Sequence, residues 1–512
     1  MKANRSNRGG RADADVVVIG AGGAGLAAAA TAATNGAKVL VIEKRRIPGG
    51  ATVYAEGVVA AESPTQQRAN ISCTRDELFR VHMRHNHWTL NARLVRELID
   101  TSADTVRWLE ERGLAFNIVT LRGGDGNPLR GPRLPAFHCP DGYGSAIVKA
   151  LHRECKESQT EILYSTQAKA LLIDSAGAVT GVAVAADGES WDIKAKSVII
   201  ATGGYSGSKE LMKKYCPAYD VRNFERLMLK SSHAGDRFRW IQDFHTGEGI
   251  EMAFDIGAAD EGLGVLLLNG PNLAAGQHAW MLGMQPSNIW INKDGKRFMD
   301  ESVGNPFMVD HAVLRQPDQM MFTVFDHAFK QEIVVNGFPY SGGLYKHIAA
   351  RIDDDLQKAV AQDTVKISNS WDEIAAWMRV DAAVLKNTIT QHNAACGNGY
   401  DPLFAKDPQA MVPLRTPPFY AGKCYPAFLV TIGGIKVNHR LEVLSRKTGR
   451  PIKGLYAAGI CTGGWSGPTY NISLLGAGCG FPIFAGRIAG KNASTHYLSQ
   501  KPVGTQVDNS KA

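Results

Sequence analysis

Apolar and small residues near the start of the chain follow the order strand, helix, strand. The run Val16 to Ile19 is continuous and β-branched, which is typical of a strand buried in a parallel sheet. Alanine-rich residues Leu26 to Thr34 predict a helix, which Asn35 and Gly36 would end. Val39 to Ile42 predict the next strand, so the segment has the pattern of a β-α-β unit in an α/β fold.

The turn after the first strand carries Gly20, Gly22 and Gly25 in the spacing G-x-G-x-x-G. Glycines there let the backbone turn tightly and approach a pyrophosphate, to which the helix N-terminus offers N–H donors. Glu43 follows the second strand, where a carboxylate can accept hydrogen bonds from a ribose. A glycine-rich turn without a nucleotide is the simpler alternative, but strand, helix, strand and acid in this order favour a bound dinucleotide.

Four further stretches associate glycines with apolar runs. They are "PGGATVYAEG" (48–57), "SVIIATGGYSG" (197–207), "GEGIEMAFDIGA" (247–258) and "GLYAAGICTGG" (454–464). The second and fourth predict buried strands, and the third predicts a helix that begins at a glycine turn. In this order and spacing, the motifs resemble those of the flavoproteins related to fumarate reductase and succinate dehydrogenase. The resemblance covers most of residues 14–495 and indicates a soluble, single-subunit type.

The resemblance implies an α/β fold: a Rossmann-like, doubly wound FAD-binding domain that is interrupted by an α+β capping domain. Inside this frame, residues 75–112 predict two amphipathic helices, and residues 320–334 predict a helical stretch. The expected division is a disordered basic tail (1–13), the FAD-binding domain (14–260 and 430–497), the capping domain (261–429) and a flexible C-terminal tail (498–512).

The resemblance also implies the cofactor and its binding residues. FAD would lie in an extended pose, and it would be noncovalent because Ala51 stands where membrane-bound members attach the flavin to a histidine. The expected FAD-binding residues are Gly20, Gly22, Ala24, Gly25, Glu43, Lys44, Gly49, Gly50, Ala51, Thr52, Gly57, Ala168, Ala201, Thr202, Gly203, Gly249, Gly433, Gly459 and Leu475.

Members of the family transfer a hydride between flavin N5 and a carbon–carbon bond next to an activating carbonyl or carboxylate. Three positions at which fumarate-reducing members carry arginine or histidine hold Asn305, Val430 and Leu474 here. The expected enzyme is therefore an FAD-dependent oxidoreductase acting on CH–CH bonds, an ene-reductase or dehydrogenase, whose substrate is not a small dicarboxylate. Alternatives are a 3-ketosteroid dehydrogenase-like enzyme, a fumarate reductase-type enzyme, an amino-acid oxidase and a non-catalytic flavoprotein.

Uncharged or weakly basic side chains are the candidates for the catalytic proton transfer. Tyr470 lies in a short insertion around residues 468–472 of another glycine-rich stretch, "GWSGPTYNISLLGAGCGFP" (464–482). It is the first candidate for a proton donor or carbonyl polariser; the alternative is a tyrosine that packs the loop. Tyr340 and His347, in the expected capping domain, are further candidates, with a surface loop as the alternative. His82, His85 and His87 stand close together without an acidic third ligand, so we expect no metal site.

The composition limits the classes of binding partner that we expect. The net charge of +8 over 512 residues comes partly from the basic first residues and is not gathered in one folded stretch, so we expect no nucleic-acid partner. No run approaches the roughly 18 consecutive apolar residues of a membrane span, and no signal peptide is evident. The eight cysteines are widely spaced and match no haem or iron–sulfur motif, which suggests a cytoplasmic enzyme with an external electron donor or acceptor and a small-molecule substrate.

Overall fold

The fold is that of a computed structural model, which describes residues 13–119, 134–218, 244–268, 270–275, 279–303, 306–338 and 351–498. Three of the residues discussed above, Asn305, Tyr340 and His347, lie outside these ranges, as do the two expected tails except for Asp13 and Leu498. Among the described helices, none combines the length and the apolar character needed to cross a bilayer.

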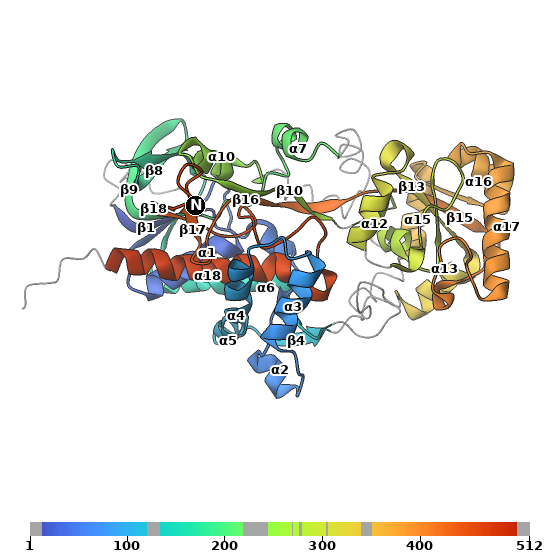
Figure 1. Ribbon diagram of the computed structural model, residues 1–512, viewed down its shortest axis with the longest axis horizontal. Helices are drawn as coiled ribbons and strands as arrows, with labels where there is room; N and C mark the ends of the chain where they lie inside the picture. The colour runs from blue at the N-terminus through green and yellow to red at the C-terminus, as the bar shows by residue number, and fades with distance from the viewer. Residues whose placement is uncertain are drawn as a thin grey trace, which may run out of the picture.

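A mostly parallel sheet forms the centre of the larger part of the molecule (Figure 1). The order is β17-β18-β9-β1-β2-β6, and β1 is parallel to both β2 and β9, with Val16 opposite Val39 and Ser197. The bounds are β1 (Ala14–Ile19), β2 (Val39–Ile42), β6 (Glu161–Leu163), β9 (Glu189–Ile200), β17 (Glu442–Leu444) and β18 (Pro451–Ala457). β9 runs beyond the sheet into an antiparallel extension with β8 (Val179–Ala186) and β7 (Gln167–Ile173).

Helices α1 (Gly23–Thr34) and α18 (Ala477–Leu498) lie side by side against this sheet, with α6 (Tyr143–Glu157) close by (Figure 1). The two helices pack closely because glycines of α18, which have no side chain, lie at their contact. A Cβ atom on Gly486 would lie 2.2 Å from the carbonyl oxygen of Ala24, and one on Gly490 would lie 2.3 Å from that of Ala28. The alanine-rich sequence of α1 therefore serves close helix packing as well as helix formation.

The segment between residues 270 and 425 forms a second lobe with hydrophobic clusters of its own. Its antiparallel sheet has the order β11-β15-β13-β12, with β14 beside β15. The strands are β11 (Asn272–Leu273), β12 (Ile289–Ile291), β13 (Met321–Asp326), β14 (Val365–Ser368) and β15 (Phe419–Tyr425). The helices are α12 (Pro306–Val313), α13 (His327–Asn336), α15 (Ile352–Ala361), α16 (Trp371–Met378) and α17 (Ala382–Asn398).

The two lobes are joined through an antiparallel pair, β10 (Asp260–Leu268) and β16 (Phe428–Ile435), which extends from the larger lobe toward the second (Figure 1). The hydrophobic cluster of the larger lobe uses residues on both sides of the second lobe in the sequence, up to Leu268 and again from Phe428. The chain thus forms an α/β lobe interrupted by an α+β lobe, which is the expected fold class. The four domain boundaries themselves stay predictions.

Two expectations of secondary structure were wrong. Residues 75–112 form three helices, α3 (Arg75–His85), α4 (Ala92–Asp100) and α5 (Ser102–Glu110). α3 ends early because His87 and Trp88 have positive φ angles, and Asn91 then caps α4 by accepting a hydrogen bond from Leu94 N. Residues 320–334 begin as strand β13, and Asp326 caps α13 by accepting from Phe329 N.

The remaining elements complete the larger lobe. A small sheet of order β3-β5-β4 lies next to α2, and short helices lead into the loops around the central sheet. Their bounds are β3 (Val58–Val59), β4 (Phe116–Val119), β5 (Phe137–Pro140), α2 (Pro64–Arg68), α7 (Lys209–Tyr215), α10 (Glu248–Asp255) and the 3-10 turns η1 (Gly50–Tyr54) and η7 (Ile472–Leu474).

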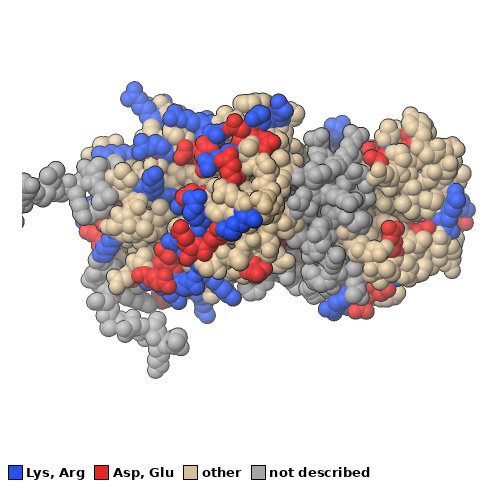
Figure 2. All heavy atoms as spheres, turned by 90° about the horizontal axis from the view of Figure 1, so that it is seen from below, with Lys and Arg blue, Asp and Glu red and all other residues tan. Residues whose placement is uncertain are grey.

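Acidic and basic side chains are interspersed over the larger lobe on the face shown in Figure 2. Ion pairs of this kind include Arg96 with Asp76 at 2.6 Å and with Asp100 at 3.0 Å. Opposite charges therefore neutralise one another locally on this face, and such exposed pairs add little to stability.

Candidate functional site

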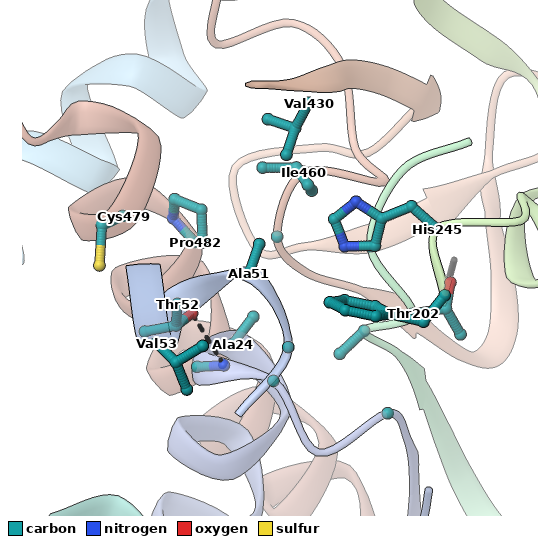
Figure 3. A pocket seen from close by; sticks show the side chains of 18 of the residues that line it. Ala24, Ala51, Thr52, Val53, Thr202, His245, Val430, Ile460, Cys479 and Pro482 are labelled. Atoms are coloured by element: carbon teal, nitrogen blue, oxygen red, sulfur yellow. Dashed lines mark hydrogen bonds between the residues drawn. The ribbon is translucent and has the colours of Figure 1, made fainter. Parts of the chain in front are cut away.

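A cavity of about 820 Å³ opens at the carboxyl ends of the parallel strands (Figure 3). Gly20 after β1, Glu43 after β2, Thr202 after β9 and Gly459 after β18 all line it. Ligands of open α/β sheets bind at this edge, because the loops there converge on one crevice. The volume lies within the range of about 300–1,000 Å³ that is usual for small-molecule sites.

The turn from β1 to α1 has the geometry expected of a phosphate-binding loop. Gly20 has a φ angle of +103°, and a Cβ atom there would lie 2.5 Å from the carbonyl oxygen of Ala201. Gly22 is the N-cap of α1 and offers no side chain to the first N–H groups of the helix. One of them, Gly23 N, donates to Thr52 Oγ1 at 3.1 Å (Figure 3). The N-terminus of α1 thus faces the cavity wall, where it favours a negative charge.

Glu43 is held rigidly at the end of β2. Its Oε2 accepts a hydrogen bond from Ala21 N and its Oε1 accepts one from Arg45 N, each at 2.8 Å. Burial raises the pKa of Glu43, and the two backbone hydrogen bonds oppose that shift. Each carboxylate oxygen keeps a lone pair for another donor, which a ribose hydroxyl in the cavity can use.

Lys44 is already paired at this end of the cavity. Its Nζ donates to Thr246 Oγ1 at 2.7 Å and to Glu248 Oε2 at 3.0 Å, and Gln167 donates to the other oxygen of Glu248 at 2.7 Å. We call this region, lined by Glu43, Lys44, Gln167 and Glu248, the glutamate end. The pairing reduces the positive charge that Lys44 can offer to a ligand.

Most residues expected to bind FAD line the cavity. They are Gly20, Gly22, Ala24, Glu43, Lys44, Gly50, Ala51, Thr52, Gly57, Ala168, Ala201, Thr202, Gly203, Gly459 and Leu475. Gly25, Gly49, Gly249 and Gly433 stand behind the wall instead. A Cβ on Gly249 would lie 2.2 Å from Thr202 Oγ1, one on Gly433 would lie 2.2 Å from Gly262 O, and Gly49 N donates to Ala21 O at 2.8 Å. These four glycines shape the cavity without facing it.

Sequence reasoning missed His245. Its ring lies in the cavity wall close to Gly203, where a Cβ would come within 2.6 Å of Nε2 (Figure 3). Burial lowers the pKa of His245 to about 3, with the charges of Lys44 and Arg45 adding to the shift, so the ring is neutral at physiological pH. The histidine stands two residues before Gly247, the N-cap of α10, and that position was the signal the sequence offered for it.

Two residues that line the cavity, His245 and Thr202, each carry a polar atom that is buried within the wall. Among the described residues, neither His245 Nδ1 nor Thr202 Oγ1 has a hydrogen-bond partner. Unpaired buried polar atoms are uncommon in native proteins, because each one costs free energy unless a partner or a ligand satisfies it. The N-terminus of α1 and the glycine turn, which line the cavity, fit the polar chain of a dinucleotide.

The part of the cavity wall around Tyr470, which we call the tyrosine end, carries apolar side chains and the thiol of Cys479 beside the phenol. It is lined by Phe137, Leu267, Val430, Tyr470 and Leu475. Among the described residues that line the cavity, the only lysine and arginine are Lys44 and Arg45, next to Glu43. Leu474, which stands at one of the family's arginine positions, is fully buried and does not line the cavity.

Tyr470 both packs the loop and faces the cavity. Its hydroxyl accepts a hydrogen bond from Gly478 N at 3.2 Å and donates a long one to Leu474 O at 3.4 Å. The side chain is buried, and burial raises the pKa of Tyr470 to about 12. Gly478 leaves room for Leu267, because a Cβ there would lie 2.8 Å from Leu267 Cδ1, whereas the Tyr470 hydroxyl at 3.9 Å would be in ordinary contact.

Comparison with known proteins places the chain in a family. The model of the FAD binding domain family matches residues 15–473. Vinyl phenol reductase from Lactiplantibacillus plantarum is 32% identical over 507 residues, covering 96% of this chain and 98% of that protein.

Solved structures agree on the fold. The open conformation of a flavocytochrome c3 fumarate reductase superposes with a TM-score of 0.71 at 26% identity, covering 96% of this chain and 79% of that one. A 3-ketosteroid-Δ4-(5α)-dehydrogenase from Rhodococcus jostii RHA1 superposes with a TM-score of 0.73 at 22% identity, covering 96% and 98%. The chain therefore belongs to the FAD binding domain family, within the fumarate reductase/succinate dehydrogenase flavoprotein superfamily, and is an FAD-dependent oxidoreductase acting on CH–CH bonds.

Proposed function

We propose that the protein reduces a carbon–carbon double bond that is conjugated either to a neutral aromatic ring or to a ketone carbonyl, as in an enone. We do not expect it to reduce the double bond of a small dicarboxylate. The observation that carries this proposal is the composition of the tyrosine end, where apolar side chains surround the Tyr470 phenol. The described residues of this wall include no cation, so two carboxylates placed there would lose their hydration without a cationic partner among those residues, which is costly. An aryl alkene buries its apolar surface there at no such cost.

The FAD-binding residues follow from the cavity. The first turn of α1, with Gly20 and Gly22, would receive the pyrophosphate, and Glu43 would accept hydrogen bonds from the ribose. His245 and Thr202, which line the cavity, would lie beside the polar chain between the two rings. Alanine at position 51 offers no atom for a covalent bond, so FAD would be held noncovalently.

Reduction of a double bond requires a hydride at one carbon and a proton at the other. Bound FAD supplies the hydride, after an external electron donor has reduced it. Tyr470 would supply the proton, because its raised pKa keeps the phenol protonated and its hydroxyl borders the tyrosine end. Gly478 N would then donate to the phenolate oxygen that proton transfer leaves.

Vinyl phenols are the first substrates to test, because the relative from Lactiplantibacillus plantarum, which matches over 98% of its own length, is a vinyl phenol reductase. A vinyl phenol is uncharged and aromatic, as the tyrosine end favours. The alkene gains two electrons and two protons to become an ethyl group. A cytoplasmic location, suggested by the spacing of the cysteines, stays a prediction.

Anaerobic flavin spectroscopy tests the proposal. The purified flavoprotein is reduced with dithionite and then mixed with 4-vinylphenol, 4-hydroxycinnamate, a cyclic enone or fumarate. We expect rapid return of the oxidised flavin spectrum with an aryl alkene or the enone, and slow return with fumarate. Rapid reoxidation by fumarate alone would contradict the substrate class, and product analysis would show which bond was reduced.

A further inference from the structure

One turn of α3 holds the loop that leads to Tyr470, which we call the tyrosine loop (residues 464–470). The His82 ring donates from Nε2 to Trp465 O at 2.8 Å, and the His85 ring donates from Nε2 to Thr469 O at 3.0 Å. Between them, Asn86 Oδ1 accepts from Gly467 N at 2.9 Å. The partners are backbone atoms of residues 465, 467 and 469, so the loop follows the end of α3 although it bends at 464–465 and again at 468–469.

The three side chains point the same way because they are three and four positions apart on one helix. Asn86 is oriented by a second bond, in which its Nδ2 donates to His82 O at 2.9 Å. This bond orients the Asn86 side chain so that its Oδ1 can accept the hydrogen bond from Gly467 N. Gly467 permits this close approach, since a Cβ there would lie 2.3 Å from Asn86 Oδ1.

The contact is buried and uncharged. His82 and Asn86 are almost inaccessible, and the His82 ring packs edge-on against Phe481 of α18 at a centroid distance of 5.7 Å. Burial lowers the pKa of His82 to about 4 and also lowers that of His85, so both rings are neutral at pH 7. Each neutral ring carries one N–H, and the carbonyl oxygens of the loop use it.

The hydrogen bond between His85 and Thr469 O lies next to Tyr470, the side chain proposed to react. His85 holds the carbonyl of Thr469, and Tyr470 follows directly, with its hydroxyl in contact with Gly478 N. A shift of the loop along α3 would therefore move the phenol relative to the cavity. Displacements of about 1 Å in a reacting group can lower a rate by about 100-fold.

We propose that His82, His85 and Asn86 are positioning residues that fix the tyrosine loop so that the Tyr470 phenol borders the tyrosine end of the cavity. This inference rests on the proposed role of Tyr470 as the proton donor. It gives the histidines of α3 a task in the reaction that requires neither a metal nor contact with the substrate.

The test compares His85→Ala, His85→Gln and Asn86→Ala in the FAD-loaded protein. Glutamine at position 85 offers an N–H where the histidine has Nε2, so it can keep the bond to Thr469 O. We expect reoxidation by 4-vinylphenol to slow about tenfold or more in His85→Ala and Asn86→Ala, and to stay within about threefold of the parent in His85→Gln. FAD content and the rate of flavin reduction by dithionite should not change.

Asn393→Ala is the matched control for Asn86→Ala. Asn393 Oδ1 accepts from Leu414 N at 2.7 Å, so it joins a helix to a loop in the same way, but in the second lobe. This control should keep the parent rate. Hydrogen–deuterium exchange should rise across residues 464–478 in Asn86→Ala and not in Asn393→Ala.

A Tyr470→Phe background separates failure of this inference from failure of the proposed function. If Tyr470→Phe is slow and His85→Ala adds little to it, the histidine acts through the tyrosine. Equal slowing by His85→Ala in both backgrounds, or an unchanged rate and exchange in His85→Ala and Asn86→Ala, would overturn the positioning role. If Tyr470→Phe alone reacts at the parent rate, the proposed proton donor is wrong.

Discussion

At the scale of single residues, burial decides the chemistry that the site can perform. Tyr470 and Cys479 both line the cavity, and burial raises the pKa of each to about 12. The raised pKa keeps the phenol protonated and so able to donate, although it makes the phenol a weaker acid, whereas a thiol that stays protonated is a poor nucleophile. His245 is kept neutral by the same effect, so it can donate or accept a hydrogen bond without adding charge.

Tyr470→Phe tests the acid directly. The phenylalanine keeps the ring and removes the proton, so we expect the flavin to reoxidise with the substrate about 100-fold more slowly, with unchanged FAD affinity. A donor must be protonated, and activity is lost only as the pH rises through its pKa. Because that pKa is raised to about 12, the parent protein should lose no activity from this group between pH 7 and 10. Stopped-flow rates across that range measure both effects.

Glu43→Gln tests the glutamate end. The amide has one acceptor oxygen in place of two, so either Ala21 N or Arg45 N would face an NH₂ group. Loss of a charged hydrogen bond costs about 1.5–3 kcal/mol, and we expect FAD to bind roughly 10- to 100-fold more weakly. Glu62→Gln is the control, because Glu62 also accepts a backbone N–H, from Arg75 at 3.1 Å, but outside the cavity. Equal FAD affinity in the two variants, by titration of apoprotein, would contradict the assignment.

At the scale of elements, the cavity depends on how closely α1 and α18 approach each other. α1 presents its N-terminus to the cavity, and α18 begins directly after the loop that contains Gly476. Both helices use small residues where they meet, so their backbones nearly touch. The position of the phosphate turn relative to the tyrosine loop therefore depends on this contact.

Gly486→Ala should disturb that contact. The new methyl group would lie 2.2 Å from Ala24 O, which is backbone and cannot swing away. Overpacking of this kind costs about 1–3 kcal/mol of unfolding free energy, and FAD affinity should fall with it. Gly397→Ala in α17 is the control: a Cβ there meets nothing within 4 Å, and replacing a helical glycine by alanine should stabilise by about 0.5–1 kcal/mol. Chemical denaturation of both variants measures the difference.

At the scale of the whole molecule, the two lobes have separate hydrophobic clusters, and the second is anchored by a buried group of four charges. Arg297 bonds to Glu301 at 2.6 Å and to Asp401 at 2.8 Å, so it is a structural partner of both carboxylates. Lys406, fully buried, lies 3.3 Å from Glu301 and donates to Asn288 O. Burial by itself would raise the pKa of Glu301, but Lys406 and Arg297 outweigh it and lower that pKa.

Lys406→Met should weaken the second lobe and spare the first. Removing one member of a buried charge group leaves another uncompensated, at a cost of about 3–5 kcal/mol. We expect tryptophan fluorescence, which reports on Trp290, Trp371 and Trp377 of this lobe among others, to show an early unfolding step. Flavin affinity should be retained. Lys423→Met, which removes a half-exposed pair with Asp363, should cost about 1 kcal/mol or less. A single transition that takes the flavin with it would contradict separate lobes.

The depressed pKa of Glu301 also sets a direction for acid stability. A carboxyl whose pKa is lower in the folded state stabilises the fold above its unfolded pKa, and that contribution is lost as the pH falls through the folded value. The second lobe should therefore become less stable below about pH 4.5, the ordinary value for glutamate. Denaturation at pH 7 and at pH 4 measures the change, which should be smaller in Glu301→Gln.

The sequence by itself determined the β-α-β unit, its glycine turn and Glu43. These features lie within about 30 residues of one another, and local rules of periodicity and turn chemistry govern them. The fold class and the family followed from motifs of the same local kind. Of the candidates for catalysis, Tyr470 lies in the cavity wall, whereas Tyr340 and His347 fall outside the described residues.

The tertiary structure alone decided which distant residues meet. Lys44 pairs with Glu248, 204 positions later, and His85 holds a loop 384 positions later. No periodicity or spacing encodes such pairs, because they arise only when separate elements pack around one cavity. Burial is also a property of the packed molecule, and it sets the protonation of His245 and Tyr470. The nucleotide turn could therefore be predicted from the chain, but the chemistry of the substrate end required the fold.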